Sequence, residues 1–101
     1  MISDDEALFI ARVRMSEIER KLILQLNRLE GNVYSWFADQ IGETCGDTQK
    51  AGHSLQELKL AEIDTVRSRS ERGSKEFNGS RLFLTKRGEV IKDVVYKLMH
   101  G

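Results

Sequence analysis

The stretch from Asp47 to Thr85 constrains the fold more than any other part of the chain. Apolar residues at helical spacing predict a helix over 47–60. Two short runs that alternate polar and apolar residues, 63–69 and 80–84, predict two half-buried strands. Thr85 stands where a residue can cap a final helix. The order of helix, strand, strand and helix predicts a β-hairpin between two helices.

Positive charge is concentrated in and around this predicted hairpin. The whole chain is neutral, with 16 Lys/Arg and 16 Asp/Glu. The segment 64–87 nevertheless holds 7 Lys/Arg and 3 Asp/Glu, whereas the segment 1–46 holds 5 and 8. A local basic patch can serve nucleic-acid binding on a neutral protein, because salt screens the charges that lie far from the phosphates.

Three further helices are predicted before this stretch, over 4–14, 16–30 and 33–41. Ser3 and Ser16 precede the first two, each with a glutamate three residues later. This is the capping-box spacing, in which the serine and the glutamate satisfy backbone N–H groups of the first turn. The first two predicted helices therefore have sequence-encoded starts.

The helix over 16–30 has the clearest pattern. Its apolar residues recur at three- and four-residue spacing, which predicts one buried face: Ile18, Leu22, Ile23, Leu26 and Leu29. Gly31 with Asn32 is expected to end this helix, and Gly42 the next, because both positions favour a left-handed backbone. Tyr34, Trp36 and Phe37 are expected to pack in the core.

Composition excludes several classes of function. The lone Cys45 and the acidic N-terminus predict a cytoplasmic protein without a signal peptide. No apolar run approaches the roughly 20 residues of a membrane span. His53 and His100 lack metal-ligand spacing with Cys45, and no phosphate loop or catalytic triad order is present. We expect neither an enzyme nor a cofactor or metal, and read Cys45 as a plain thiol rather than a redox sensor.

Two segments resemble the winged helix-turn-helix superfamily, in particular small regulators of the MarR and PadR kind. Residues 37–42, Phe-Ala-Asp-Gln-Ile-Gly, are similar to the end of the helix before the turn. Residues 82–88, Leu-Phe-Leu-Thr-Lys-Arg-Gly, are similar to the exit from the second wing strand. The spacing from Gly42 to Leu55 is longer than usual. Either the turn is longer or the recognition helix begins one turn earlier.

The resemblance implies an α+β, mostly α, winged helix-turn-helix domain over 1–101. A three-helix core with a two-stranded wing would occupy 16–85. A helix within 1–15 and another over 86–101 would flank the core, and their surplus apolar residues predict a homodimer. In such a domain the recognition helix enters the major groove of double-stranded DNA and the wing contacts the backbone or minor groove.

The candidate DNA-binding residues follow from these placements. The helix over 47–60 would present polar side chains that can bind base edges or phosphates: Thr48, Gln49, Lys50, His53, Ser54 and Gln56. The wing would present cations to the phosphate backbone: Arg67, Arg69, Arg72, Lys75 and Arg81. The simpler alternatives are a solvated helix face and a hairpin kept soluble by its charge.

The leading hypothesis is a sequence-specific DNA-binding transcriptional regulator that acts as a dimer. The alternative is a winged-helix module for protein interaction or assembly, which the zero net charge and the acidic residues of the recognition helix favour. A small subunit of a larger nucleic-acid machine is a third option. The sequence identifies no small-molecule effector.

Overall fold

The computed structural model describes residues 3–65 and 80–100, apart from the side chains of Thr65 and Ser80. The fold is α+β and mostly helical, with one antiparallel pair of strands. The elements in chain order are α1 (Asp4–Phe9), its continuation as a π-helical turn (Ile10–Arg14), α2 (Glu17–Gln25), α3 (Tyr34–Ile41), α4 (Cys45–Glu57), β1 (Ala61–Thr65), β2 (Ser80–Leu84) and α5 (Lys86–His100). No helix among the described residues is both long enough and apolar enough to cross a membrane.

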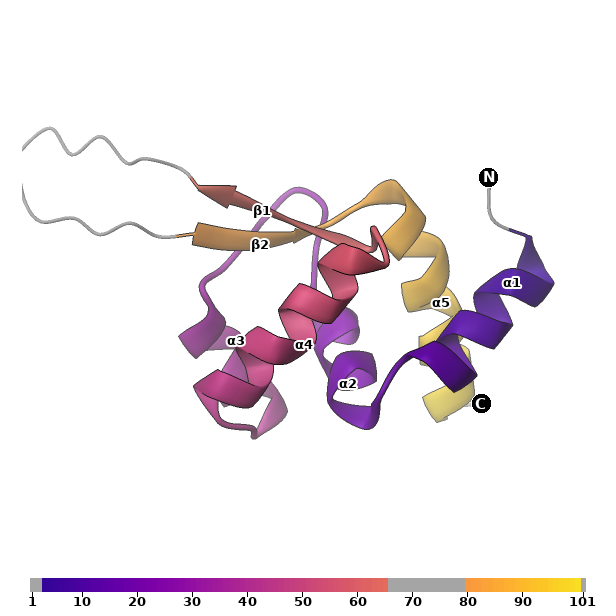
Figure 1. Cartoon of the computed structure of the whole chain (residues 1–101), viewed down its shortest axis with the longest axis horizontal. Coiled ribbons are helices and arrows are strands. Elements are labelled where there is room, and N and C mark those ends of the chain that lie inside the picture. Colours follow the sequence, from indigo (N-terminus) through magenta and orange to yellow (C-terminus); the bar gives the residue numbers. More distant parts are fainter. Residues whose placement is uncertain (1–2, 66–79, 101) are drawn as a thin grey trace, which may run out of the picture.

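The helices α2, α3 and α4 pack against one another, and the base of the hairpin follows directly from α4 (Figure 1). Helix α5 returns from β2 to contact α2 and α1, so α1 and α5 lie together at the end of the molecule opposite α3 (Figure 1). The largest fully buried side chains come from α2, α3, α4, α5, β2 and the segments just after α2 and α4: Phe37, Leu22, Ile23, Leu26, Leu55, Leu60, Leu82, Ile91, Val95 and Thr48. Smaller buried residues of α1, the π-helical turn and β1 join them: Ala7, Ile10, Ala11 and Ala61. One hydrophobic core therefore joins all the elements.

The predicted helix starts and stops are confirmed at three points. The Ser16 hydroxyl accepts from the Glu19 amide at 3.2 Å, and the Glu19 carboxylate accepts from the Ser16 amide at 3.1 Å, which completes a capping box. The Ser3 hydroxyl accepts from the Glu6 amide at 3.2 Å. Gly42 ends α3 with a φ of 70°, the left-handed conformation that glycine adopts without steric cost.

The predicted end of the second helix is wrong, because α2 stops at Gln25 and the chain then becomes extended. The following segment pairs with the sheet: the carbonyls of Asn27 and Asn32 accept from the amides of Leu84 and Leu82, each at 2.9 Å. The helical spacing of Leu29 is therefore fortuitous, and that side chain is 87% exposed. Tertiary hydrogen bonds to the free edge of β2 outweigh the local helical pattern.

Helix α4 begins earlier than predicted. Its N-cap is Thr44, whose hydroxyl accepts from the Asp47 amide at 3.1 Å, rather than Asp47 or Thr48. The turn after Gly42 is therefore short. The longer spacing from Gly42 to Leu55 is accommodated by an earlier start of the helix, which was one of the two alternatives.

The hairpin is confirmed, with a shifted first strand. Strand β1 begins at Ala61, two residues earlier than predicted, and pairs with β2 in the register Ala61↔Leu84 to Thr65↔Ser80. Ala61 and Ile63 lie on the face that packs on the core, opposite Leu84 and Leu82. The predicted continuation of the first strand over 66–69 lies outside the described residues.

The turn between α4 and β1 is bound to the start of α5. The Thr85 hydroxyl donates to the Lys59 carbonyl at 2.8 Å and accepts from the Gly88 amide at 2.9 Å, so Thr85 caps α5 as predicted. The Arg87 guanidinium donates to the Leu58 carbonyl at 3.0 Å. A Cβ on Gly88 would overlap the Leu60 carbonyl oxygen, so the first turn of α5 and the turn after α4 are in direct backbone contact.

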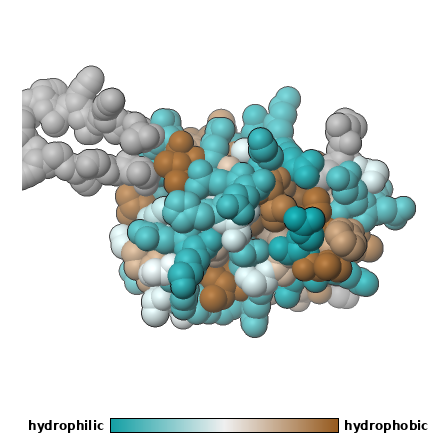
Figure 2. Space-filling view, in the orientation of Figure 1, coloured by the Kyte–Doolittle hydropathy of each residue, from teal (hydrophilic) through white to brown (hydrophobic). Residues whose placement is uncertain are grey.

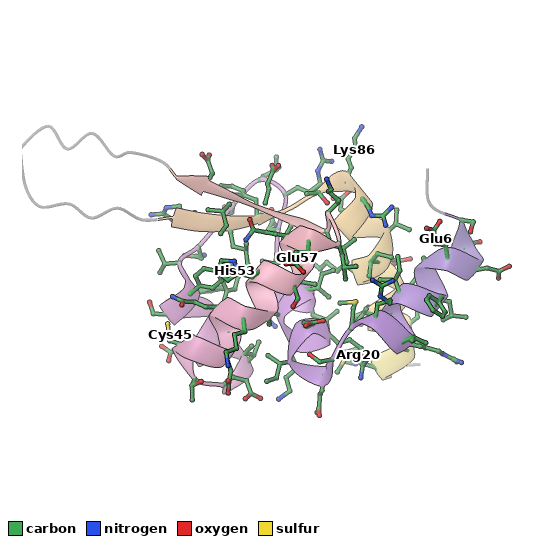
Figure 3. All side chains as sticks on the ribbon, in the orientation of Figure 1. Glu6, Arg20, Cys45, His53, Glu57 and Lys86 are labelled. Carbon is green, nitrogen blue, oxygen red and sulfur yellow. The ribbon has the colours of Figure 1, made fainter. Side chains whose placement is uncertain are left out.

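The N-terminal helix is attached to α2 by one side chain. The Arg20 guanidinium Nη1 donates to the carbonyl oxygens of Ala11, at 2.9 Å, and Met15, at 2.6 Å. Both carbonyls lie where the helix that begins at α1 comes to an end, which is where backbone acceptors lack partners within the helix. Figure 3 shows Arg20 in the region where this helix meets α2.

We expect Gly88→Ala to lower the free energy of unfolding by about 1–3 kcal/mol, because the added methyl group would overlap a backbone carbonyl that cannot rotate away. Urea denaturation followed by circular dichroism measures this change. The matched control is Gly46→Ala, since a Cβ there meets nothing within 4 Å. The control should be neutral or up to about 1 kcal/mol more stable. Equal stability of the Gly88 variant and the wild type would contradict the contact.

Candidate nucleic-acid interface

The outer face of α4 presents the most continuous set of the predicted site residues. Gln49, Lys50 and His53 are exposed, and they lie on the side of α4 opposite its buried residues. Figure 3 shows Cys45, His53 and Glu57 at successive positions along the same helix. Among the described residues, the side chains of Gln49, Lys50 and His53 have no hydrogen-bond or ion-pair partner. Their donors and acceptors are therefore available to an external molecule.

Ser54 and Gln56 are half-buried at the edges of this face. Ser54 and Lys50 line a small surface hollow against the first turn of α2, together with Ser16, Glu19 and Asp47. The hollow contains two carboxylates, so it does not favour an anion. Ser54 and Gln56 therefore border the outer face and contribute less accessible surface than Gln49, Lys50 or His53.

Thr48 is a correction to the predicted site. Its side chain is fully buried, and its hydroxyl donates to the Thr44 carbonyl at 2.8 Å. The prediction placed Thr48 off the core face because the apolar residues of α4 alone defined that face. A threonine can join the core when its hydroxyl returns a hydrogen bond to the preceding turn. Thr48 cannot reach a base or phosphate in this arrangement.

The predicted wing is described only at its base. Arg81 is exposed on β2, lies opposite Asp64 in the strand register, and donates to the Gly31 carbonyl at 3.2 Å. The other predicted wing cations fall outside the described residues: Arg67, Arg69, Arg72 and Lys75. Glu62 and Asp64 are exposed on the same face as Arg81, so the base of the hairpin is not itself basic.

Tyr34 and Gly52 form a contact that the sequence analysis missed. A Cβ on Gly52 would lie 2.5–3.0 Å from atoms of the Tyr34 ring and its hydroxyl, so only glycine lets this side chain lie against α4. The Tyr34 hydroxyl is buried and has no hydrogen-bond partner among the described residues. Burial also raises the pKa of Tyr34 above its usual 10.0. The sequence feature that could have predicted this contact is Gly52 itself, because a glycine inside a helix often marks the close approach of another group.

The ring of His53, on the outer face of α4, lies next to the ring of Tyr34 in α3. The two ring centroids lie 6.4 Å apart with an interplanar angle of 36°. The predicted core placement of the adjacent aromatic pair is right for Phe37, which is 1% exposed, and wrong for Trp36, which is 40% exposed. Trp36 instead packs one ring edge against Phe37, at a centroid distance of 5.2 Å.

The turn before α4 is held to α2 by an ion pair. The Lys21 ammonium lies 2.9 Å from the Glu43 carboxylate, and this hydrogen bond is the main cause that raises the pKa of Lys21. Glu43 stands two residues before the first residue of α4. The contact therefore contributes to positioning the start of α4, although a solvent-accessible pair with half-buried side chains stabilises the fold only slightly.

The described residues include no cluster of three or more His, Cys, Asp or Glu side chains that could hold a metal ion. The charged residues of α4 are Asp47, Lys50 and Glu57, so this helix carries no positive excess of its own. Any attraction to a polyanion would depend on cations elsewhere in the chain. The outer face of α4 is suited to hydrogen bonding more than to charge neutralisation.

No protein-family model and no curated protein sequence matches this chain. A crystal structure of RV1404 from Mycobacterium tuberculosis is similar to it, with a TM-score of 0.66 and 16% sequence identity. The match covers 93% of this chain and 59% of that chain. At this identity the likeness concerns the fold alone. The arrangement of helices and hairpin thus recurs in a longer bacterial protein.

The raised pKa of Tyr34 predicts a pH dependence of stability. The neutral phenol is favoured in the folded state, so its contribution is complete below pH 10.0 and is lost as the pH rises through the higher folded-state value. We expect the free energy of unfolding to fall less between pH 9 and pH 11 in Tyr34→Phe than in the wild type. Urea denaturation at both pH values measures the difference. Identical falls in both proteins would contradict the assignment.

Proposed function

We propose that this protein is a winged helix-turn-helix regulator that binds double-stranded DNA through the outer face of α4. The observation that carries this proposal is the outer face itself. It joins Gln49, Lys50 and His53 on a helix packed against α2 and α3, and their polar groups have no partner among the described residues. Unpaired glutamine, lysine and histidine side chains on the exposed face of a helix can read base edges in the major groove.

The arrangement around α4 supports the same function. Helix α3, the turn at Gly42 and α4 stand in the order of a helix-turn-helix, and the hairpin leaves directly from the end of α4. The backbone pairing of Asn32 with Leu82 also joins the segment between α2 and α3 to the hairpin. In this arrangement α4 would enter the groove and the hairpin would lie over the flanking backbone.

The two ends of the chain support a dimer. Exposed apolar side chains gather on α1, its π-helical turn and α5: Leu8, Phe9, Val13, Val90, Tyr96, Leu98 and Met99. Figure 2 shows hydrophobic surface at the end of the molecule where α1 and α5 lie. Apolar surface of this kind marks interaction sites in soluble proteins. Pairing of two copies there would leave both α4 helices free to bind two half-sites.

One observation favours the alternative function, a winged-helix module for protein interaction. Glu57 is exposed on α4 seven residues after Lys50, so a carboxylate shares the outer face. Phosphates repel a carboxylate, whereas a basic protein surface would bind it. A titration with duplex DNA separates the two functions, because only the regulator binds duplex DNA without a protein partner.

The removal of one cation from the outer face should weaken DNA binding. We expect Lys50→Ala to raise the Kd for random duplex DNA about fivefold to tenfold at low salt and to flatten its salt dependence by roughly one ion. A salt series of fluorescence-anisotropy titrations measures both quantities. The matched control is Lys97→Ala, which removes an exposed lysine from α5 that forms an ion pair with Asp93.

Unchanged binding by the control together with weakened binding by Lys50→Ala would support the proposal. Equal effects of the two substitutions would mean that α4 is not the binding surface. No binding by the wild type, even at low salt, would overturn the regulator and leave the interaction module as the working function. The next step would then be a search for a protein partner.

Charge placed on the apolar end of the molecule should dissociate the dimer. Phe9 and Val13 are 52% and 62% exposed, so Phe9→Asp with Val13→Asp should leave the monomer folded. We expect the wild type to sediment as a dimer at tens of micromolar and the double variant as a monomer. Leu29→Asp is the control, because Leu29 is 87% exposed but lies in the segment between α2 and α3. A monomeric wild type would contradict the dimer.

A further inference from the structure

A buried hydroxyl without a partner is an unusual feature of the proposed interface. The Tyr34 hydroxyl exposes less than 1 Å² and forms no hydrogen bond with the described residues. Phenylalanine would place the same ring against Gly52 without leaving a polar atom unsatisfied. The tyrosine hydroxyl oxygen itself lies against Gly52, 2.6 Å from where a Cβ would stand. Buried polar groups in folded proteins nearly always have a partner. We therefore expect a hydrogen-bond partner for this hydroxyl that a small side-chain movement can bring within hydrogen-bonding distance.

His53 meets this requirement. It follows Gly52 directly, it is exposed and so able to change its rotamer, and its ring centroid lies 6.4 Å from that of Tyr34. A centroid separation of 6.4 Å is short enough for one hydrogen bond of roughly 2.8 Å between the hydroxyl and a ring nitrogen when the two point toward each other. A change of the His53 rotamer can turn a ring nitrogen toward the Tyr34 side chain, because His53 is exposed.

We propose that the Tyr34 hydroxyl donates a hydrogen bond to one ring nitrogen of neutral His53 and thereby fixes its tautomer. The other ring nitrogen then carries the proton and points away from Tyr34 as a donor. This inference rests on the proposed function for its biological role, since an outward donor would read an acceptor on a base. Purine N7, guanine O6 and thymine O4 are the acceptors in the major groove. Tyr34 is thus a positioning residue for His53.

The hydrogen bond can be tested without DNA. Long-range proton–nitrogen correlation spectra at pH 8 distinguish a single tautomer from the usual mixture of neutral imidazoles. We expect one protonated and one unprotonated ring nitrogen for His53 in the wild type, and averaged nitrogen shifts in Tyr34→Phe. Tyr96→Phe is the matched control, because Tyr96 stacks on His100 at a centroid distance of 4.4 Å in α5. Identical His53 spectra in the wild type and Tyr34→Phe would overturn the inference.

The role in DNA reading is tested by a double-mutant cycle on a duplex selected from a random pool. We expect Tyr34→Phe to raise the Kd about threefold to tenfold in the wild-type background and to have no effect when His53→Ala is also present. A fixed His53 tautomer in a protein that binds no duplex would uphold the tyrosine–histidine pair and overturn the regulator. Equal effects of Tyr34→Phe in both backgrounds would show that the pair does not serve base reading.

Discussion

The contact between the turn after α4 and the first turn of α5 is the constraint on which the rest of the structure depends. The turn residues Leu58, Lys59 and Leu60 all place a carbonyl against the segment that begins at Thr85. The Leu60 carbonyl also accepts from the Thr85 amide at 3.1 Å, and its side chain is fully buried. This junction fixes the end of α4, the base of both strands and the direction of α5 together. A change at Gly88 would consequently disturb the turn that ends α4, the helix that carries the proposed interface.

Much of the fold could be predicted because its signals are local. The capping box at Ser16, the left-handed stop at Gly42 and the cap at Thr85 are decided within a few residues of each position. The segment after Gln25 could not be predicted, because its conformation is set by hydrogen bonds to β2 far along the chain. The same is true of Leu26, whose carbonyl accepts from the Lys92 ammonium at 2.7 Å and so joins the end of α2 to α5.

The candidate site was predictable in outline and not in detail. Helical periodicity placed Gln49, Lys50 and His53 on one face, and all three are exposed there. Periodicity could not place Thr48, because the burial of a hydroxyl depends on whether a carbonyl in the preceding turn can accept it. It also could not find Tyr34, whose position depends on the packing of α3 across Gly52. Residues that contact solvent follow the local pattern, whereas residues between two helices follow the tertiary arrangement.

The attachment of the N-terminal helix through Arg20 has a mechanical consequence. Arg20 belongs to α2, which packs directly on α4. Its guanidinium donates hydrogen bonds to two carbonyls at the end of the N-terminal helix. If two copies pair through α1 and α5, the contacts of Arg20 and of α2 with α4 would help to set the distance between the two α4 helices. The two α4 helices of the dimer would then stand at a fixed separation. The dimer would bind two half-sites of matching spacing along a duplex and would not bind sites with an altered number of intervening base pairs.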